Sequence, residues 1–260
     1  MGHLRLADRL PRYQNWQRVV EALQDPSQDL EEVAAKTADA AKYKLSETAD
    51  SPYVWYPYWF LIQLADHAQS PARFRSFLRQ HDIEVDEDQS TVSLFAELTR
   101  SIEDRRQEFP SPTALDELAL DAFQEAAGQI VLSGTESLFD SGLEDARQAF
   151  ARVAPARPFG RLSRAYLGAY YGEILSYFLS YELGNEVGPE HRFESLDDAE
   201  KFSRQLDRYT HHVSELVEEF AEEWYGKEYW KEGHISQDAA RRFLHVAFRK
   251  FRQQLELETQ

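Results

Sequence analysis

Between Ser195 and Tyr225 the apolar residues recur in alternating steps of three and four positions. This heptad spacing places one apolar stripe along a long helix, and a strand cannot use it because strand side chains alternate with a period of two. The flanking positions form no ladder of opposite charges, so we expect a helix of about 195–225 packed inside a bundle. The stripe consists of Ala199, Phe202, Leu206, Tyr209, Val213, Leu216 and Phe220.

The rest of the chain also has helical spacing. Near the start, Trp16, Val19, Val20 and Leu23 lie at positions i, i+3, i+4 and i+7, and later segments repeat this pattern after Ser-Pro or Asp-Pro starts. We find no convincing alternation with a period of two and no fixed internal repeat. The sequence therefore predicts an all-α protein, a multi-helix bundle of roughly eight to ten helices with a long heptad-patterned C-terminal helix.

The clearest interruption is the Pro-Ser-Pro segment at 110–112. Proline cannot continue a helix, and closely spaced prolines commonly mark a boundary. We expect an N-terminal helical region at 1–109 and a C-terminal helical bundle at 110–260, with one continuous domain as the alternative.

Composition excludes several classes of protein. The 260 residues contain no cysteine, which removes disulfides and thiolate metal sites. No apolar run approaches the roughly 18 residues of a membrane span, and the N-terminus lacks the apolar region of a signal peptide, so we expect a soluble cytoplasmic protein. The net charge of −17 either repels nucleic acid and anionic membranes or reflects adaptation to a salty or high-GC background.

No motif specifies a chemistry. Eight histidines show no zinc-binding spacing, and there is no nucleophile elbow or phosphate-binding loop. Asp207, His211 and Glu215 lie along one helix stripe, and such a stripe could supply two or three metal ligands. It falls on the outer face of the helix, away from the apolar stripe, so we favour a solvated surface over a metal site. We therefore predict no catalytic residue, cofactor or metal, and the sequence leans away from an enzyme.

The segment from Ser51 to Ala68 is unusually aromatic, and it contains no lysine or arginine. Because Tyr56 precedes Pro57, we expect a bent lead-in followed by a helix that starts at Pro57. Side chains on several helix faces then pack in the core or contact another protein, and nucleobase stacking is disfavoured without nearby positive charge. The candidate partner-binding residues are Tyr53, Trp55, Tyr56, Tyr58 and Trp59.

Two arginine clusters break the acidic background. They neutralise the acidic stretch at 186–232 within the fold, or they bind phosphate or a nucleic-acid backbone. The candidate anion-binding residues are Arg157, Arg161 and Arg164 in one cluster and Arg241, Arg242 and Arg249 in the other.

A tyrosine-rich helix at about 160–183 contains the close pair Gly168 and Gly172. Glycine at this spacing allows a neighbouring helix to approach, so we expect a central buried helix, with a ligand cavity beside it as the alternative. Glu173 would need a partner there, and we expect a nearby arginine to supply it.

Three functions remain open. The first is a non-catalytic interaction protein or accessory subunit, with another protein or a second copy as partner. The second is a helical protein of a defence or DNA-processing system that contacts nucleic acid through its arginines. The third is an enzyme or small-molecule binder with a cavity between helices.

Overall fold

The computed structural model describes residues 13–86, 89–134, 141–153 and 156–258. These ranges contain eleven helices and, apart from isolated bridges, no strand, which confirms the all-α prediction. In chain order the helices are α2 (Tyr13–Gln24), α3 (Leu30–Thr48), α4 (Pro52–His67), α5 (Pro71–Gln80), α6 (Thr91–Arg106), α7 (Ala114–Leu132), α8 (Leu143–Arg152), α9 (Ala156–Asn185), α10 (Leu196–Val213), α11 (Glu215–Glu232) and α12 (Gln237–Glu258).

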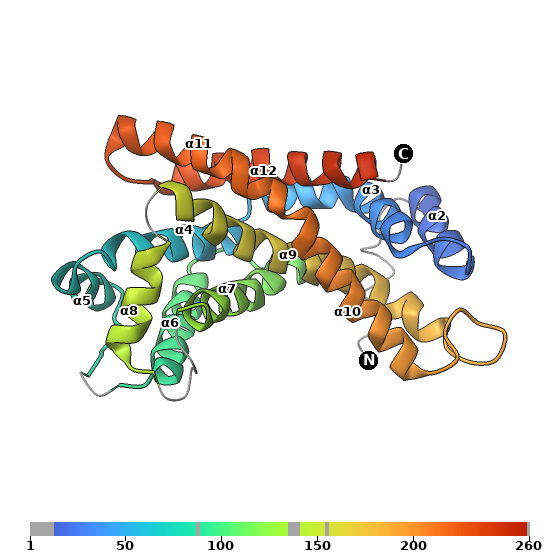
Figure 1. Ribbon diagram of the computed structural model, residues 1–260, viewed down its shortest axis with the longest axis horizontal. Helices are drawn as coiled ribbons and strands as arrows, with labels where there is room; N and C mark the ends of the chain where they lie inside the picture. The colour runs from blue at the N-terminus through green and yellow to red at the C-terminus, as the bar shows by residue number, and fades with distance from the viewer. Residues whose placement is uncertain (1–12, 87–88, 135–140, 154–155, 259–260) are drawn as a thin grey trace.

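The central element is α9, which runs diagonally through the molecule in Figure 1. It packs against α7 on one side and against α10 and α11 on another. Tyr166, Tyr170 and Tyr171 are completely buried in it. The tyrosine-rich sequence therefore forms the centre of the core, as predicted.

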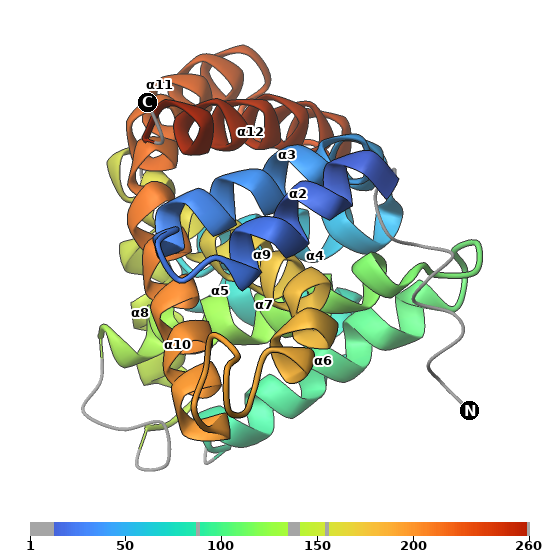
Figure 2. The ribbon, with the colours of Figure 1, turned by 90° about the vertical axis from the view of Figure 1, so that its right-hand side faces the viewer.

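Helices from both sides of the Pro110–Pro112 segment pack against each other. The early helix α3 lies along the last helix α12, and Figure 2 shows the two side by side. Helix α4 packs on α7, α8 and α12. None of the helices in the described ranges combines the length and apolar character that a membrane span requires.

The predicted helix at 195–225 is wrong in one respect, because it breaks at Ser214. The Ser214 hydroxyl donates to the carbonyl of His211 at 2.6 Å, a back-bond that bends helices. Ahead of the break the heptad stripe is buried as expected. Beyond it Leu216 and Phe220 are only partly buried, and the fully enclosed positions are Val217 and Ala221. The break thus rotates the buried face and accounts for one helix more than predicted.

The predicted start of a helix at Pro57 is also wrong. Helix α4 begins at Pro52 and continues through Pro57. An internal proline costs about 3 kcal/mol, whereas each buried large apolar side chain contributes about 1.5–3 kcal/mol. Since eleven of the 16 residues of α4 are buried, packing outweighs the local preference of Tyr56 for an extended backbone.

Candidate functional site

The aromatic segment of α4 divides into buried and partly buried side chains. Tyr53, Tyr56 and Tyr58 are 6%, 3% and 0% exposed. The Tyr58 hydroxyl lies 2.7 Å from Ser163 Oγ, within the core. Trp55 and Trp59 are only partly buried. Of the five candidate partner-binding residues, these two tryptophans are therefore the ones that a partner can reach most directly.

The indole of Trp59 is held in place from one side. Its Nε1 donates to the carbonyl of Ile235 at 3.1 Å, and Gln63 Nε2 donates to the same carbonyl at 3.1 Å. The His81 ring packs edge-on against it at a centroid distance of 6.3 Å. These contacts fix the ring orientation, so its accessible part is preorganised.

Two surface hollows meet at Trp59. The first, of about 370 Å³, extends from Tyr56 over the end of α6, and the second, of about 450 Å³, extends from Trp55 over the loop before α12. Both are also lined by Gln237. Trp59 thus stands as a ridge between two depressions built from segments far apart in the sequence.

The charges around the first hollow are unevenly compensated. Arg100 pairs with Glu97, and Arg105 pairs with Glu108 at 2.6 Å. Asp82 and Asp104 line the same hollow and form no ion pair within the described part of the chain. The rim therefore offers carboxylates to a partner, while its arginines already have counter-ions.

The first arginine cluster faces acidic side chains of α11. Arg164 lies 2.8 Å from Glu215 and 3.0 Å from Glu218, and Arg161 lies 3.6 Å from Glu218. The Arg157 side chain lies outside the described residues. This is the arrangement that the charge-neutralising interpretation predicts for Arg161 and Arg164.

The second cluster is spread along α12. Arg242 pairs with Glu228 at 3.1 Å, and Arg241 lies 3.6 Å from Asp238. Arg249 is exposed, and within the described ranges it takes part in no ion pair. Two of these three arginines therefore also have acidic partners in the fold.

The glycine pair of α9 brings α10 very close. A Cβ on Gly168 would lie 2.9 Å from Ser214 Oγ, and one on Gly172 would lie 3.1 Å from Thr210 Oγ1. Sequence reasoning missed Gly160, where a Cβ would lie 2.7 Å from the Glu218 carbonyl oxygen. The signal was present, because the three glycines fall near one face of the helix.

The expected arginine partner of Glu173 is wrong. Burial raises the pKa of Glu173, and the nearby carboxylates of Asp121, Asp207 and Glu125 raise it further. The arginines lie nearer the start of α9, where they contact α11 instead. Glu173 therefore belongs to an acidic cluster between α7, α9 and α10.

The possible metal stripe on α10 and α11 is engaged in separate contacts. Ser176 donates to Asp207 at 3.4 Å, His211 lies 3.2 Å from Glu125, and Glu215 pairs with Arg164. In the residues that the structure describes, no group of three or more histidine or carboxylate side chains has the arrangement of a metal site.

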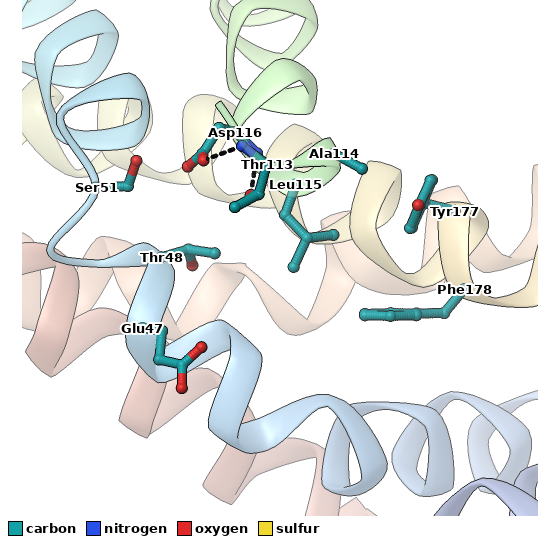
Figure 3. Close-up of a pocket in the computed structure, with 9 residues that line it drawn as sticks. All are labelled: Glu47, Thr48, Ser51, Thr113, Ala114, Leu115, Asp116, Tyr177 and Phe178. Atoms are coloured by element: carbon teal, nitrogen blue, oxygen red, sulfur yellow. Dashed lines mark hydrogen bonds between the residues drawn. The ribbon is translucent and has the colours of Figure 1, made fainter. Parts of the chain in front are cut away.

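A separate cavity of about 250 Å³ lies beside the tyrosine-rich helix (Figure 3). Its walls come from the end of α3 and the following Ser51, from residues 113–116 at the start of α7, and from Tyr177 and Phe178 of α9. A ligand cavity beside this helix was the alternative to a purely buried role, but Glu173 does not line this space. The sequence analysis did not identify its residues, and the one sequence signal that could have pointed to a wall is the Thr113-to-Asp116 capping spacing.

Asp116 is the unusual residue of this cavity. It is 5% exposed, and its Oδ2 accepts from the backbone N–H of Thr113 at 2.7 Å. Its Oδ1 is buried without a hydrogen-bond partner in the described structure. The pKa of the buried Tyr170 is raised, mainly by burial. A hydrogen bond with Thr48 lowers this pKa, and the charge of Asp116 raises it. Tyr170 therefore stays a neutral phenol next to the carboxylate.

Comparison of the chain with protein-family models, with curated proteins and with solved structures gave no match.

Proposed function

We propose that this protein is a non-catalytic interaction protein that binds another protein through Trp55, Trp59 and the two adjoining hollows. The observation that carries the proposal is the position of Trp59, a fixed and partly exposed indole between two depressions. Tryptophan is enriched among the residues that dominate binding energy, and rigid anchors lose little entropy on binding. The proposal includes a cytoplasmic location, which the lack of cysteine favours.

The charges favour a basic protein segment as the partner. Asp82 and Asp104 supply uncompensated carboxylates on the rim, so a lysine or arginine next to an apolar side chain matches the first hollow. A nucleic-acid backbone would need free positive charge, and the rim arginines are already paired. A second copy is disfavoured because each chain carries a net charge of −17.

Selection of displayed random peptides on the immobilised protein tests this proposal. We expect enriched peptides that combine a basic residue with an aromatic or aliphatic one. Binding of these peptides should fall at least tenfold in Trp59→Ala and in Asp104→Lys, and should be unchanged in Leu196→Ala. Leu196 is 70% exposed and lies on α10, away from the residues that line the hollows, so it is a matched surface control.

The Asp104→Lys variant separates binding from folding. Asp104 is exposed in the last turns of α6, where a cation interacts favourably with the helix dipole, so the variant should remain fully folded. Peptides that bind all three variants as well as the unmodified chain, or a selection that enriches nothing, would overturn the proposal.

A further inference from the structure

The surface around Trp59 continues beyond its first hollow. A third hollow, of about 720 Å³, lies over the loop between α5 and α6 and the first turns of α6. It shares Asp82 and Arg100 with the first hollow, and the first hollow shares Trp59 with the second. The three hollows therefore adjoin in the order second, first, third, and Asp82 stands at the junction of the last two.

The third hollow is polar and mainly acidic. Four carboxylates and one arginine line it, and this arginine, Arg100, already pairs with Glu97. Asp82 and Glu84 are exposed and form no ion pair within the described part of the chain. The described residues that line this hollow include no apolar side chain, whereas aromatic rings line the first. A partner side chain in the third hollow is therefore held by charge and hydrogen bonds, which suits lysine or arginine.

Asp82 occupies a backbone position that favours glycine. It follows the C-cap of α5 with a φ of 55°, in the left-handed region. Its N–H bonds to the carbonyl of Arg79, and the N–H of Ile83 bonds to the carbonyl of Leu78, which is the Schellman arrangement that ends many helices. A Cβ raises the energy of this conformation, and the negative end of the helix dipole disfavours a carboxylate beside it. Aspartate is therefore a costly residue at this position.

No contact within the fold offsets this cost. Asp82 forms no ion pair in the described ranges, and its side chain is exposed at the lip of two hollows. Strained backbone in folded proteins concentrates where a side chain is used for binding. Asp104 lines the first hollow and Glu84 lines the third, so a basic side chain in either hollow would face two carboxylates, one of them Asp82.

We infer that the partner segment carries two basic side chains, one in the first hollow and one in the third, on the two sides of Asp82 and next to the apolar side chain that meets Trp59. The inference rests on the proposed function, because it specifies the partner of the same surface. The occupant is a segment of another protein, since the carboxylates of the hollows and the net charge of −17 disfavour a nucleic acid or a second copy.

Peptides selected from a random displayed library on the immobilised chain are the probes. We expect the enriched peptides to be dibasic, with two basic residues besides an apolar one. In fluorescence anisotropy, replacement of either basic residue by glutamine should weaken binding at least fivefold. Enriched peptides that need only one basic residue, but still lose affinity for Trp59→Ala, would overturn the inference and leave the proposed function standing. A selection that enriches nothing would overturn both.

Glu84→Gln locates the second basic side chain, because Glu84 lines only the third hollow. This variant should bind the dibasic peptides at least fivefold more weakly. It should bind one of the two singly substituted peptides as the unmodified chain does, since that peptide has no charge left in the third hollow. Glu103→Gln is the matched control, an exposed carboxylate of α6 that lines none of the three hollows, and it should bind every peptide normally. Normal binding of the dibasic peptides by Glu84→Gln would refute the inference.

Variants of Asp82 separate binding from folding. Asp82→Gly relieves the left-handed backbone, so it should raise the urea midpoint while it weakens the dibasic peptides at least fivefold. Asp82→Asn keeps a residue that tolerates this conformation, and it should lose the same affinity without a lower midpoint. Unchanged affinity in both variants would contradict the role of Asp82.

Light scattering tests the alternative occupant. We expect a monomer at the concentrations used for anisotropy. A dimer of the unmodified chain that Glu84→Gln converts to a monomer would show that a second copy fills the third hollow, and it would also refute the inference.

Discussion

The Ser214 hydroxyl lies so close to Gly168 that a Cβ on this glycine would come within 2.9 Å of the oxygen. The same hydroxyl donates to the His211 carbonyl, and the helix breaks at this residue. Two consequences follow from one contact. Helix α10 approaches α9 closely, and the buried face of α11 is rotated relative to that of α10.

The close approach predicts the effect of adding a methyl group. Alanine normally stabilises a helix by about 1 kcal/mol relative to glycine. At Gly168 the methyl group would displace Ser214 and His211, so we expect Gly168→Ala to destabilise the protein by about 1–3 kcal/mol in urea unfolding. Gly128→Ala is the control, because nothing lies within 4 Å of its added Cβ, and it should stabilise by about 0.5–1 kcal/mol. Equal stability of the two variants would refute the close contact.

The rotation of the buried face of α11 predicts which of two adjacent residues, Leu216 or Val217, tolerates a charged side chain. Val217 is 1% exposed, whereas Leu216 is partly buried although the heptad pattern places it inward. Burial of an unpaired carboxylate costs several kcal/mol, so Val217→Asp should abolish cooperative thermal unfolding. Leu216→Asp should remain folded with a lower midpoint, as followed by circular dichroism. An uninterrupted heptad helix would give the opposite order.

The fold class was predictable because amphipathic spacing reports burial directly. The break at Ser214 was not, because nothing in the sequence separates a serine that bonds back to the carbonyl of His211 from any other serine within a helical pattern. The continuity of α4 through Pro57 likewise depends on burial of most of its faces. Neutralisation of the acidic stretch at 186–232 was one of two interpretations of the first arginine cluster, and the glutamates that Arg164 meets depend on helix packing.

The candidate sites also depend on tertiary packing that the local sequence does not reveal. The aromatic segment was recognisable, yet its division into buried tyrosines and accessible tryptophans depends on neighbours such as Ser163 and Ile235, which are distant in sequence. The cavity depends on the end of α3 and the start of α7 meeting beside Tyr177 and Phe178 of α9. Asp116 attracted no attention in the sequence, and only the folded structure shows that one of its oxygens is buried without a hydrogen-bond partner in the described residues.

The acidic cluster around Glu173 predicts that Glu173→Gln stabilises the protein, and that the gain depends on pH. Burial and the carboxylates of α7 and α10 raise the pKa of Glu173 above its ordinary value of 4.5. The folded state then holds the proton more tightly than the unfolded state, so this group's contribution to stability falls as the pH rises from about 4.5 through the raised pKa. Glu173→Gln removes this cost, and we expect a higher urea midpoint at neutral pH that converges with the unmodified chain below about pH 4.5. The charged groups that act on Glu173 are Asp121 and Glu125 on α7 and Asp207 on α10, and His211 acts in turn on Asp207.

Glu144 provides a control of opposite sign. Its hydrogen bond from Arg147 lowers its pKa to about 2, so its contribution to stability is present above pH 4.5 and is lost as the pH falls to about 2. Glu144→Gln should therefore lower the urea midpoint at neutral pH. If the urea midpoints of Glu173→Gln and Glu144→Gln shift in the same direction at neutral pH, the pH dependence is not specific to the acidic cluster.

The contacts of Arg164 predict a structural role instead of DNA binding. Its guanidinium is held by Glu215 and Glu218, so Arg164→Gln leaves two carboxylates close together and should destabilise the protein by about 1 kcal/mol. Arg249→Gln makes the same charge change at an exposed residue and should stay within about 0.5 kcal/mol of the unmodified chain. Anisotropy of a labelled DNA duplex at low salt, where backbone contacts are strongest, should show no saturable binding. Binding that weakens steeply with salt and disappears in Arg161→Glu would instead favour the nucleic-acid hypothesis, because the side chain of Arg161 is the more exposed of the two, at 77% against 32% for Arg164.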